Sequence, residues 1–307
     1  MADLEHCQVV IIGGGPAGIS AAIWCAELGL GCTLVERSDQ LGGQLLSTHG
    51  AIDNYPGVSA ANGREMRDRF VASMRDRSID IRFGTSISSV DIRTKTLTFA
   101  DGGTVTAEAL MIATGVRRRE LGVAGERELA GRGVLQSGVH ERDSTTGKTV
   151  VVVGGGDAAA ENAALLAESA ERVVLVHRSD RFRARPEFMD AVRGLDRVDI
   201  LTNSRVTVID GSTRVTGVVV ENAMTGETDR IDADAVLVRI GVEPNAELFR
   251  HQLDLDGCGY ITVDAQCQTS APGVYAIGDI ANPHSPTIAT AVGTGATAAK
   301  AINCQRS

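Results

Sequence analysis

The chain has 307 residues, 43% of them hydrophobic, which is enough for two domains that each bury a core of their own. This composition excludes a disordered or fibrous protein. The formal net charge of −9 argues against nucleic acid as the main ligand. No uncharged apolar run approaches the roughly 18 residues of a membrane span, and residues 1–5 are too acidic for a secretion signal, so we expect no membrane association.

The cysteines predict neither a disulfide framework nor a metal site. They are scattered, without a C-x-x-C pair or zinc spacing, and the histidines also lack ligand spacing. We therefore expect no bound metal and a reducing, cytoplasmic setting. The six cysteines are Cys7, Cys25, Cys32, Cys258, Cys267 and Cys304.

A strand–turn–helix–strand pattern opens the chain. An apolar run at residues 8–12 leads into Gly-Gly-Gly-Pro-Ala-Gly at 13–18, which matches G-x-G-x-x-G. A helix over 17–28 and a strand over 32–35 follow, and that strand ends at Glu36. The glycines let backbone amides approach a pyrophosphate at the helix N-terminus, and the acid suits a ribose hydroxyl. This pattern predicts a dinucleotide site.

The pattern recurs from residue 149, with a strand over 149–153, a G-x-G-x-x-A turn at 154–159, a helix to about 169 and a strand over 172–176. That last strand ends in His177-Arg178 instead of an acid, and Arg181, Arg183 and Arg185 follow. Guanidinium groups can bind a 2′-phosphate that an acid would repel, which favours NADPH over NADH. Arg178 and Arg183 are the predicted phosphate ligands; a solvated basic loop is the alternative.

Two dinucleotide sites with opposite ribose chemistry indicate a flavoprotein with one prosthetic and one visiting dinucleotide. At this point the sequence resembles the low-molecular-weight thioredoxin reductases from about residue 8 to 300. Beyond the two fingerprints, the motifs that carry the resemblance are Gly-Gly-Gln-Leu at 42–45, Asn-Tyr-Pro-Gly at 54–57, Ala-Thr-Gly at 113–115, His-Arg-Ser-Asp-Arg-Phe-Arg-Ala at 177–184 and Gly-Val-Tyr-Ala-Ile-Gly-Asp at 273–279.

The resemblance implies an α/β fold with two Rossmann-like dinucleotide-binding domains of the three-layer ββα type. The FAD-binding domain would be split, over 1–115 and 245–307, with the NAD(P)H-binding domain at 116–244 between its parts. The chain would cross at Gly115 and Gly241. The family also implies FAD and NADPH as cofactors, with NADH as the alternative donor, and a homodimer.

The resemblance also implies particular contacts. Asp279 would accept a hydrogen bond from a flavin ribityl hydroxyl, and a helix over about 286–303, with Pro286 in its first turn, would point its N-terminus at the flavin. Thr287 and Ile288 depart from the family's Gln-Ala, and Ser179 stands where the family often has arginine.

The full set of predicted cofactor-binding residues follows the motifs. For FAD it is Gly13, Gly15, Pro16, Ala17, Gly18, Glu36, Arg37, Gly43, Gln44, Asn54, Ala113, Thr114, Gly115, Gly278, Asp279, Thr287 and Ile288. For NADPH it is Gly154, Gly156, Asp157, Ala158, Ala159, His177, Arg178, Arg183, Ile240 and Gly241.

The redox-active dithiol of the reductases is missing. Their Gly-Arg-Gly-Val segment is present at 131–134, but Leu-Gln-Ser-Gly-Val-His-Glu follows where they have Cys-Ala-Thr-Cys-Asp. The spacing to Gly154 is ungapped, so Ser137 and His140 occupy the cysteine positions and Glu141 that of the acid. Neither serine nor histidine can relay two electrons as a disulfide. His140 is the candidate proton shuttle, with Glu141 and Ser137 beside it; an ordinary loop histidine is the alternative.

The sequence therefore predicts an FAD-dependent NAD(P)H oxidoreductase that passes hydride from NADPH to FAD and then directly to a small organic molecule, a quinone, oxygen or a protein carrier. The enzyme alternatives are a ferredoxin- or flavodoxin-NADP reductase and a flavoenzyme that acts on thiols or disulfides in specialised metabolism. A non-catalytic flavin-binding sensor is a further alternative, although two fingerprints exceed what a sensor needs. The identity of the acceptor is not encoded in any motif.

Overall fold

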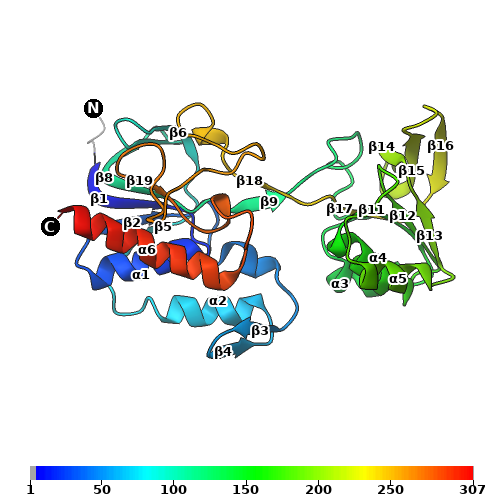
Figure 1. The fold of residues 1–307 in the computed structure, drawn as a ribbon, viewed down its shortest axis with the longest axis horizontal. Coiled ribbons are helices and arrows are strands. Elements are labelled where there is room, and N and C mark those ends of the chain that lie inside the picture. Colours follow the sequence, from blue (N-terminus) through cyan, green and yellow to red (C-terminus); the bar gives the residue numbers. More distant parts are fainter. Residues whose placement is uncertain (1–4, 307) are drawn as a thin grey trace. The chain divides into compact units, whose positions relative to one another are not determined.

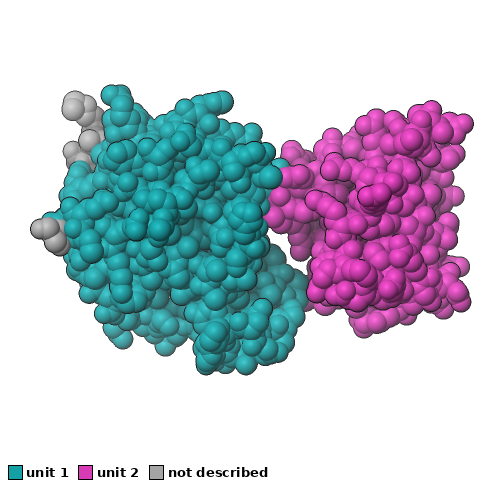
Figure 2. Space-filling view, viewed as in Figure 1, with its two compact units in different colours: residues 1–117, 243–307 teal, residues 118–242 magenta. Residues whose placement is uncertain are grey.

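A computed structural model describes residues 5–306 and divides the chain into two compact units (Figure 1, Figure 2). Unit 1 consists of residues 1–117 and 243–307, and unit 2 consists of residues 118–242. Unit 1 contains a mixed, mainly parallel sheet, unit 2 contains a parallel sheet, and each unit has its own buried core. A dinucleotide fingerprint lies in each.

The chain passes between the units twice, in two short strands that pair with each other. These are β9 (Val116–Arg118) and β18 (Val242–Pro244). Gly115 and Gly241, the predicted crossing points, directly precede them with φ of +62° and +98°. Both angles lie in the region that favours glycine. The assignment of one dinucleotide to each unit remains a prediction.

The central sheet of unit 1 has seven strands, of which β1 (Glu5–Ile12) is flanked by β2 (Cys32–Val35) and β8 (Thr104–Ile112) in parallel. Their burial is nearly continuous because helices cover one face and a strand-and-loop layer covers the other. The remaining strands are β5 (Asp80–Arg82) and β19 (Val274–Ala276), both parallel, and β6 (Ile87–Asp91) and β7 (Thr96–Phe99), both antiparallel.

Helices α1 (Pro16–Glu27) and α6 (Ile288–Arg306) lie side by side against this sheet (Figure 1). Their contact is close because Gly295 faces the backbone of α1: a Cβ there would lie 2.5 Å from the Ala17 carbonyl oxygen. The rest of unit 1 includes α2 (Gly63–Ala72) and the hairpin of β3 (Ile52–Tyr55) and β4 (Val58–Ala60).

The last helix begins later than predicted. Pro286 precedes the helix instead of lying in its first turn, and α6 starts at Ile288. The physical reason is a local cap: the Thr287 hydroxyl accepts from the Thr290 N–H, and the Thr290 hydroxyl accepts from the Thr287 N–H, each at 3.2 Å. Threonine oxygens satisfy amides that a helix start leaves without partners.

Unit 2 confirms the predicted three-layer ββα arrangement. Helices α4 (Asp157–Ala167) and α5 (Pro186–Arg193) cover one face of a parallel sheet, and an antiparallel sheet covers the other (Figure 1). The parallel sheet runs in the order β10 (Val134–Leu135), β17 (Ala235–Arg239), β11 (Thr149–Gly154), β12 (Arg172–Val176), β13 (Val198–Leu201). The antiparallel sheet holds β14 (Ser204–Gly211), β15 (Val215–Asn222) and β16 (Thr228–Asp232).

Across residues 5–306, none of the helices combines the length and the apolar character that crossing a membrane requires.

The α1–α6 contact yields a matched test. We expect Gly295→Ala to lower the free energy of unfolding by about 1–3 kcal/mol, because the new methyl would meet backbone atoms of α1 that cannot move aside. Gly293→Ala, on the same helix with open space around it, should raise that free energy by up to about 1 kcal/mol through helix propensity. Urea denaturation measures both; equal effects would contradict the role assigned to this packing.

Candidate active site

The first fingerprint is held in its tight turn by contacts that only glycine allows. Gly13 has φ of +108°, and a Cβ there would lie 2.4 Å from the carbonyl oxygen of Ala113 at the end of β8. A Cβ at Gly18 would lie 1.9 Å from the Gly13 carbonyl oxygen. Gly15 has open space where a Cβ would be. The turn therefore leaves room at Gly15, which begins α1 beside the predicted Pro16 and Ala17, for a phosphate group to approach backbone amides.

Glu36 closes this turn from the side. Its buried carboxylate accepts hydrogen bonds from the Gly14 N–H at 2.7 Å and from the Ser38 N–H and hydroxyl at 2.9 Å each. The side chain thus fixes β2 to the fingerprint at the carboxyl edge of the sheet. The predicted contact with a ribose hydroxyl remains a prediction, as does one for the neighbouring exposed Arg37.

Residues far apart in sequence meet at the same edge of unit 1. The Gln44 amide donates to the Asp279 carboxylate at 2.8 Å. A Cβ at Gly43 would lie 3.0 Å from the Gly15 Cα, and one at Gly115 would lie 3.9 Å from the Gln44 amide nitrogen. Burial raises the pKa of Asp279, and the Gln44 hydrogen bond partly offsets this. The half-buried Asp279 acceptor beside a glycine-lined turn fits the ribityl and pyrophosphate parts of FAD.

The remaining predicted FAD residues are placed less directly. Thr114 exchanges hydrogen bonds with Asn245, its hydroxyl donating to the Asn245 carbonyl at 2.9 Å and its carbonyl accepting from the Asn245 amide at 2.7 Å. Gly278 donates its N–H to the Thr294 hydroxyl at 2.9 Å, which ties the turn before α6 to that helix. Asn54 is exposed on β3, and the structure records no contact that joins it to the others.

The second fingerprint repeats the first geometry in unit 2. Gly154 has φ of +154°, and a Cβ there would lie 2.2 Å from the Arg239 carbonyl oxygen at the end of β17. Gly156 again has open space, directly before α4, whose first turn holds the predicted Asp157, Ala158 and Ala159. This turn has the same room for a pyrophosphate as that of unit 1.

His177 supports the second fingerprint from inside. It is buried, and a Cβ at Gly155 would lie 2.1 Å from its ring. The ring packs on Phe182 with centroids 4.7 Å apart, and its Nε2 lies 2.9 Å from the Ser179 hydroxyl. Ser179 therefore has a local use in orienting this ring. A direct contact between His177 and the dinucleotide remains a prediction.

The basic loop after β12 is fastened to the fingerprint by its backbone. Arg183 and Ala184 donate their N–H groups to the Gly155 carbonyl at 2.7 and 3.0 Å. Arg185 is committed to Asp157, at 2.8 Å, and its backbone N–H contributes most to holding the pKa of that acid below its usual range. Arg178 and Arg183 are exposed and make no ion pair among residues 5–306. These two cations remain the predicted 2′-phosphate ligands.

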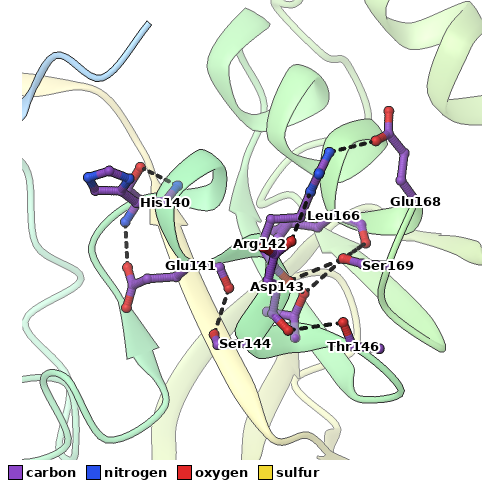
Figure 3. Close-up of polar contacts among 11 residues, drawn as sticks. His140, Glu141, Arg142, Asp143, Ser144, Thr146, Leu166, Glu168 and Ser169 are labelled. Atoms are coloured by element: carbon purple, nitrogen blue, oxygen red, sulfur yellow. Dashed lines mark hydrogen bonds and ion pairs between the residues drawn. The ribbon is translucent and has the colours of Figure 1, made fainter. Parts of the chain in front are cut away.

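Ser137, His140 and Glu141 come together in the short helix α3 (Gly138–Glu141), which follows β10. The Ser137 hydroxyl accepts from the His140 N–H at 3.3 Å, and Glu141 accepts from the Gln136 and Ser137 N–H groups at 2.7 and 2.8 Å. Two of the three side chains thus cap their own helix. Figure 3 shows the His140 and Glu141 side chains projecting to the same side of α3.

This capping gives two members of the predicted catalytic trio a structural task. Serine at the N-cap with a carboxylate reaching back to the start of the helix satisfies amides that would otherwise lack partners. Gly138 lies close to α4, since a Cβ there would lie 2.1 Å from the Asn162 side-chain oxygen. Ser137 and Glu141 therefore position α3, and a proton-transfer role for the exposed His140 remains a prediction.

Two arginines beside α3 were missed from the sequence. Arg118 ends β9 and Arg239 ends β17, and both donate to the Gln136 carbonyl oxygen, Arg239 at 3.2 Å. One signal could have drawn attention to Arg239, because a cation at the end of the apolar run Ala235–Arg239 is unusual. The Gln136 carbonyl that both arginines share could not have been identified, because it lies far from them in the sequence.

Two cysteines also proved closer than the sequence suggests. Cys25 on α1 and Cys32 on β2 are buried neighbours, and a hydrogen bond with Cys32 together with burial raises the pKa of Cys25. All six cysteines are free thiols. Among the described residues there is no cluster of three or more potential metal ligands.

Comparison with known proteins identifies the family to which the chain belongs. A model of the pyridine nucleotide-disulphide oxidoreductase family matches residues 7–295. The chain belongs to this family. It is 37% identical to thioredoxin reductase of Mycolicibacterium smegmatis over 298 residues, 95% of this chain and 94% of that one. It is 36% identical to the bifunctional thioredoxin reductase/thioredoxin of Mycobacterium leprae over 301 residues, 95% of this chain and 64% of that protein.

The solved structures agree. The thioredoxin reductase of Lactococcus lactis in its FR conformation superposes with a TM-score of 0.81 at 30% identity, over 96% of this chain and 97% of that one. The predicted likeness to thioredoxin reductases is confirmed. The protein is accordingly an FAD-dependent oxidoreductase of the thioredoxin-reductase-like family, whose cofactors are FAD and NADPH.

The basic loop gives a test of donor choice. We expect Arg178→Gln and Arg183→Gln each to weaken NADPH binding by about tenfold while NADH binding stays within twofold, because only NADPH carries the 2′-phosphate that a guanidinium binds. Rapid flavin-reduction kinetics measure both donors. Arg193→Gln, an exposed arginine paired with Asp190 on α5, is the control. Equal loss for both donors would contradict the assignment.

Proposed function

We propose that this enzyme moves two electrons from NADPH through FAD directly to a non-dithiol acceptor, a small organic molecule, a quinone or oxygen, without a protein disulfide. The observation that carries the proposal is the composition of unit 2. Residues 118–242 contain no cysteine at all, and Ser137 and His140 stand at the positions where the resemblance places the redox pair. No thiol in this unit can receive electrons.

The cysteines of unit 1 offer no substitute. Cys25 and Cys32 are buried, and Cys32 is the first residue of β2, whereas the fingerprint follows the last residue of the paired strand β1. Three residues of strand separate Cys32 from the carboxyl edge, about 10 Å at the usual rise. This pair therefore lies away from the edge where the predicted FAD residues meet.

Residues of the chain have separate tasks in this reaction. Glu36 and the glycine turn hold the first fingerprint in shape, while Gln44 and Asp279 form a polar pair at the same edge. Ser137 and Glu141 hold α3 in place and so orient His140. Bound FAD supplies a centre that takes up a hydride and releases two electrons. NADPH is oxidised to NADP⁺, the acceptor gains two electrons and two protons, and His140 delivers one of the protons.

A reductive titration tests the proposal. Under anaerobic conditions NADPH should bleach the flavin, and one equivalent per flavin should suffice, since no disulfide takes up a second pair of electrons. The matched variant is Ser137→Cys with His140→Cys, which introduces the family's spacing and should consume a second equivalent. A wild-type enzyme that takes up two equivalents would refute the proposal, as would a flavin that NADPH leaves oxidised.

His140 has its own prediction. We expect His140→Ala to slow quinone reduction about 100-fold, because an imidazole that supplies a proton is lost. The rate of flavin bleaching by NADPH should not change. Steady-state and rapid-mixing kinetics measure the two steps. His251→Ala, at an exposed position in unit 1, is the control; an unchanged rate of quinone reduction in His140→Ala would remove the proton-transfer role.

A further inference from the structure

Two guanidinium groups converge on a single carbonyl oxygen at the edge of the unit 2 sheet. Arg118 Nη1 and Arg239 Nη2 both donate to the backbone carbonyl oxygen of Gln136, which directly follows β10. Arg239 also donates to the carbonyl of Val238 at 2.8 Å. The two arginines come from strands far apart in the chain. Their convergence is therefore a property of the fold.

This pair of cations is not neutralised by the protein. Among residues 5–306, neither guanidinium has a carboxylate within ion-pair distance. Glu141 is the acid whose charge favours both cations, but its carboxylate is committed to the amides of Gln136 and Ser137. Burial, and then the charge of Arg118, lowers the pKa of Arg239 to about 10. Like charges held together in this way are stabilised when an anion binds between them.

The order of strands places the pair relative to the dinucleotide. The basic loop follows β12, the fingerprint follows β11, Arg239 ends β17, and Gln136 follows β10, which is the far strand of the series. A dinucleotide with its 2′-phosphate at the loop and its pyrophosphate at the fingerprint directs its nicotinamide towards β17. The arginine pair then lies at the nicotinamide end, next to the helix that carries His140.

We propose that Arg118 and Arg239 form a subsite that binds a carboxylate or phosphate group of the enzyme's electron acceptor. This inference rests on the proposed function, and it narrows the acceptor to an anionic small molecule. Two planar forks that already share one acceptor atom present further N–H donors to a ligand with paired oxygens. The same anion would be delivered beside His140, the group that supplies its proton.

The experiment measures binding without electron transfer. Oxidised, FAD-loaded enzyme is saturated with NADP⁺, so that the 2′-phosphate and pyrophosphate sites are filled, and is titrated calorimetrically with malonate, inorganic phosphate or neutral malonamide. We expect malonate or phosphate to bind and neutral malonamide not to bind. A higher affinity for malonate than for phosphate identifies a carboxylate ligand, and a higher affinity for phosphate identifies a phosphate ligand. Either order of affinities supports the subsite.

Variants then locate the binding. Arg118→Gln and Arg239→Gln should each weaken anion binding at least tenfold, and Arg239→Lys should weaken it less, because the charge remains while the fork is lost. Arg127→Gln, an exposed arginine paired with Glu120 in the same unit, should leave it unchanged. The flavin spectrum and the melting temperature show whether each variant is folded.

Three outcomes would overturn the inference. The first is no anion binding by the wild type, and the second is an anion affinity that stays within twofold of wild type in both glutamine variants. The third is that Arg239→Gln lowers the affinity for NADP⁺ as much as it lowers the affinity for the anion. The last outcome would assign the arginine to the dinucleotide. Since the measurement needs no turnover, its result is independent of the reductive titration. An anion that binds to an enzyme whose flavin NADPH cannot bleach would refute the proposed function and leave the subsite standing.

Discussion

Each half of this enzyme depends on one close contact, between the first glycine of a fingerprint and the carbonyl oxygen that ends the neighbouring strand. Gly13 meets Ala113 in unit 1, and Gly154 meets Arg239 in unit 2, with room for a hydrogen atom and nothing larger. The contact forces the chain to turn sharply at the carboxyl edge of a parallel sheet. The following helix then points its amino end at the ligand, as dinucleotide binding requires.

Much of this could be predicted because it is encoded locally. The strands at 32–35 and 172–176 have the predicted bounds, since apolar runs closed by glycine or by charge leave few alternatives. The start of α6 was predicted wrongly because a pair of threonine hydroxyls, at 287 and 290, decided it over the proline. The Arg118–Arg239 pair could not be predicted, since its shared partner is a backbone carbonyl that only the tertiary fold brings near.

The segment at the positions where the resemblance places the dithiol forms a short folded element of its own. A serine and a glutamate there cap a short helix, and a glycine lets that helix approach α4. From the sequence, three polar residues were predicted to form one catalytic group, because polarity at a functional position is ambiguous between chemistry and structure. The hydrogen bonds give Ser137 and Glu141 a structural task in the cap, and the catalytic roles of all three residues remain predictions.

The absence of cysteine from residues 118–242 also bears on chemical resilience. Thiolate centres are the targets of soft metal ions, electrophiles and peroxides, and enzymes that cycle through a dithiol are inactivated when it is capped or over-oxidised. Unit 2, which has no cysteine thiol, has no such point of attack. The exposed thiols of the chain, Cys258 and Cys304, lie outside that unit. The proposed electron transfer without a protein disulfide would therefore continue under conditions that inactivate enzymes dependent on a dithiol.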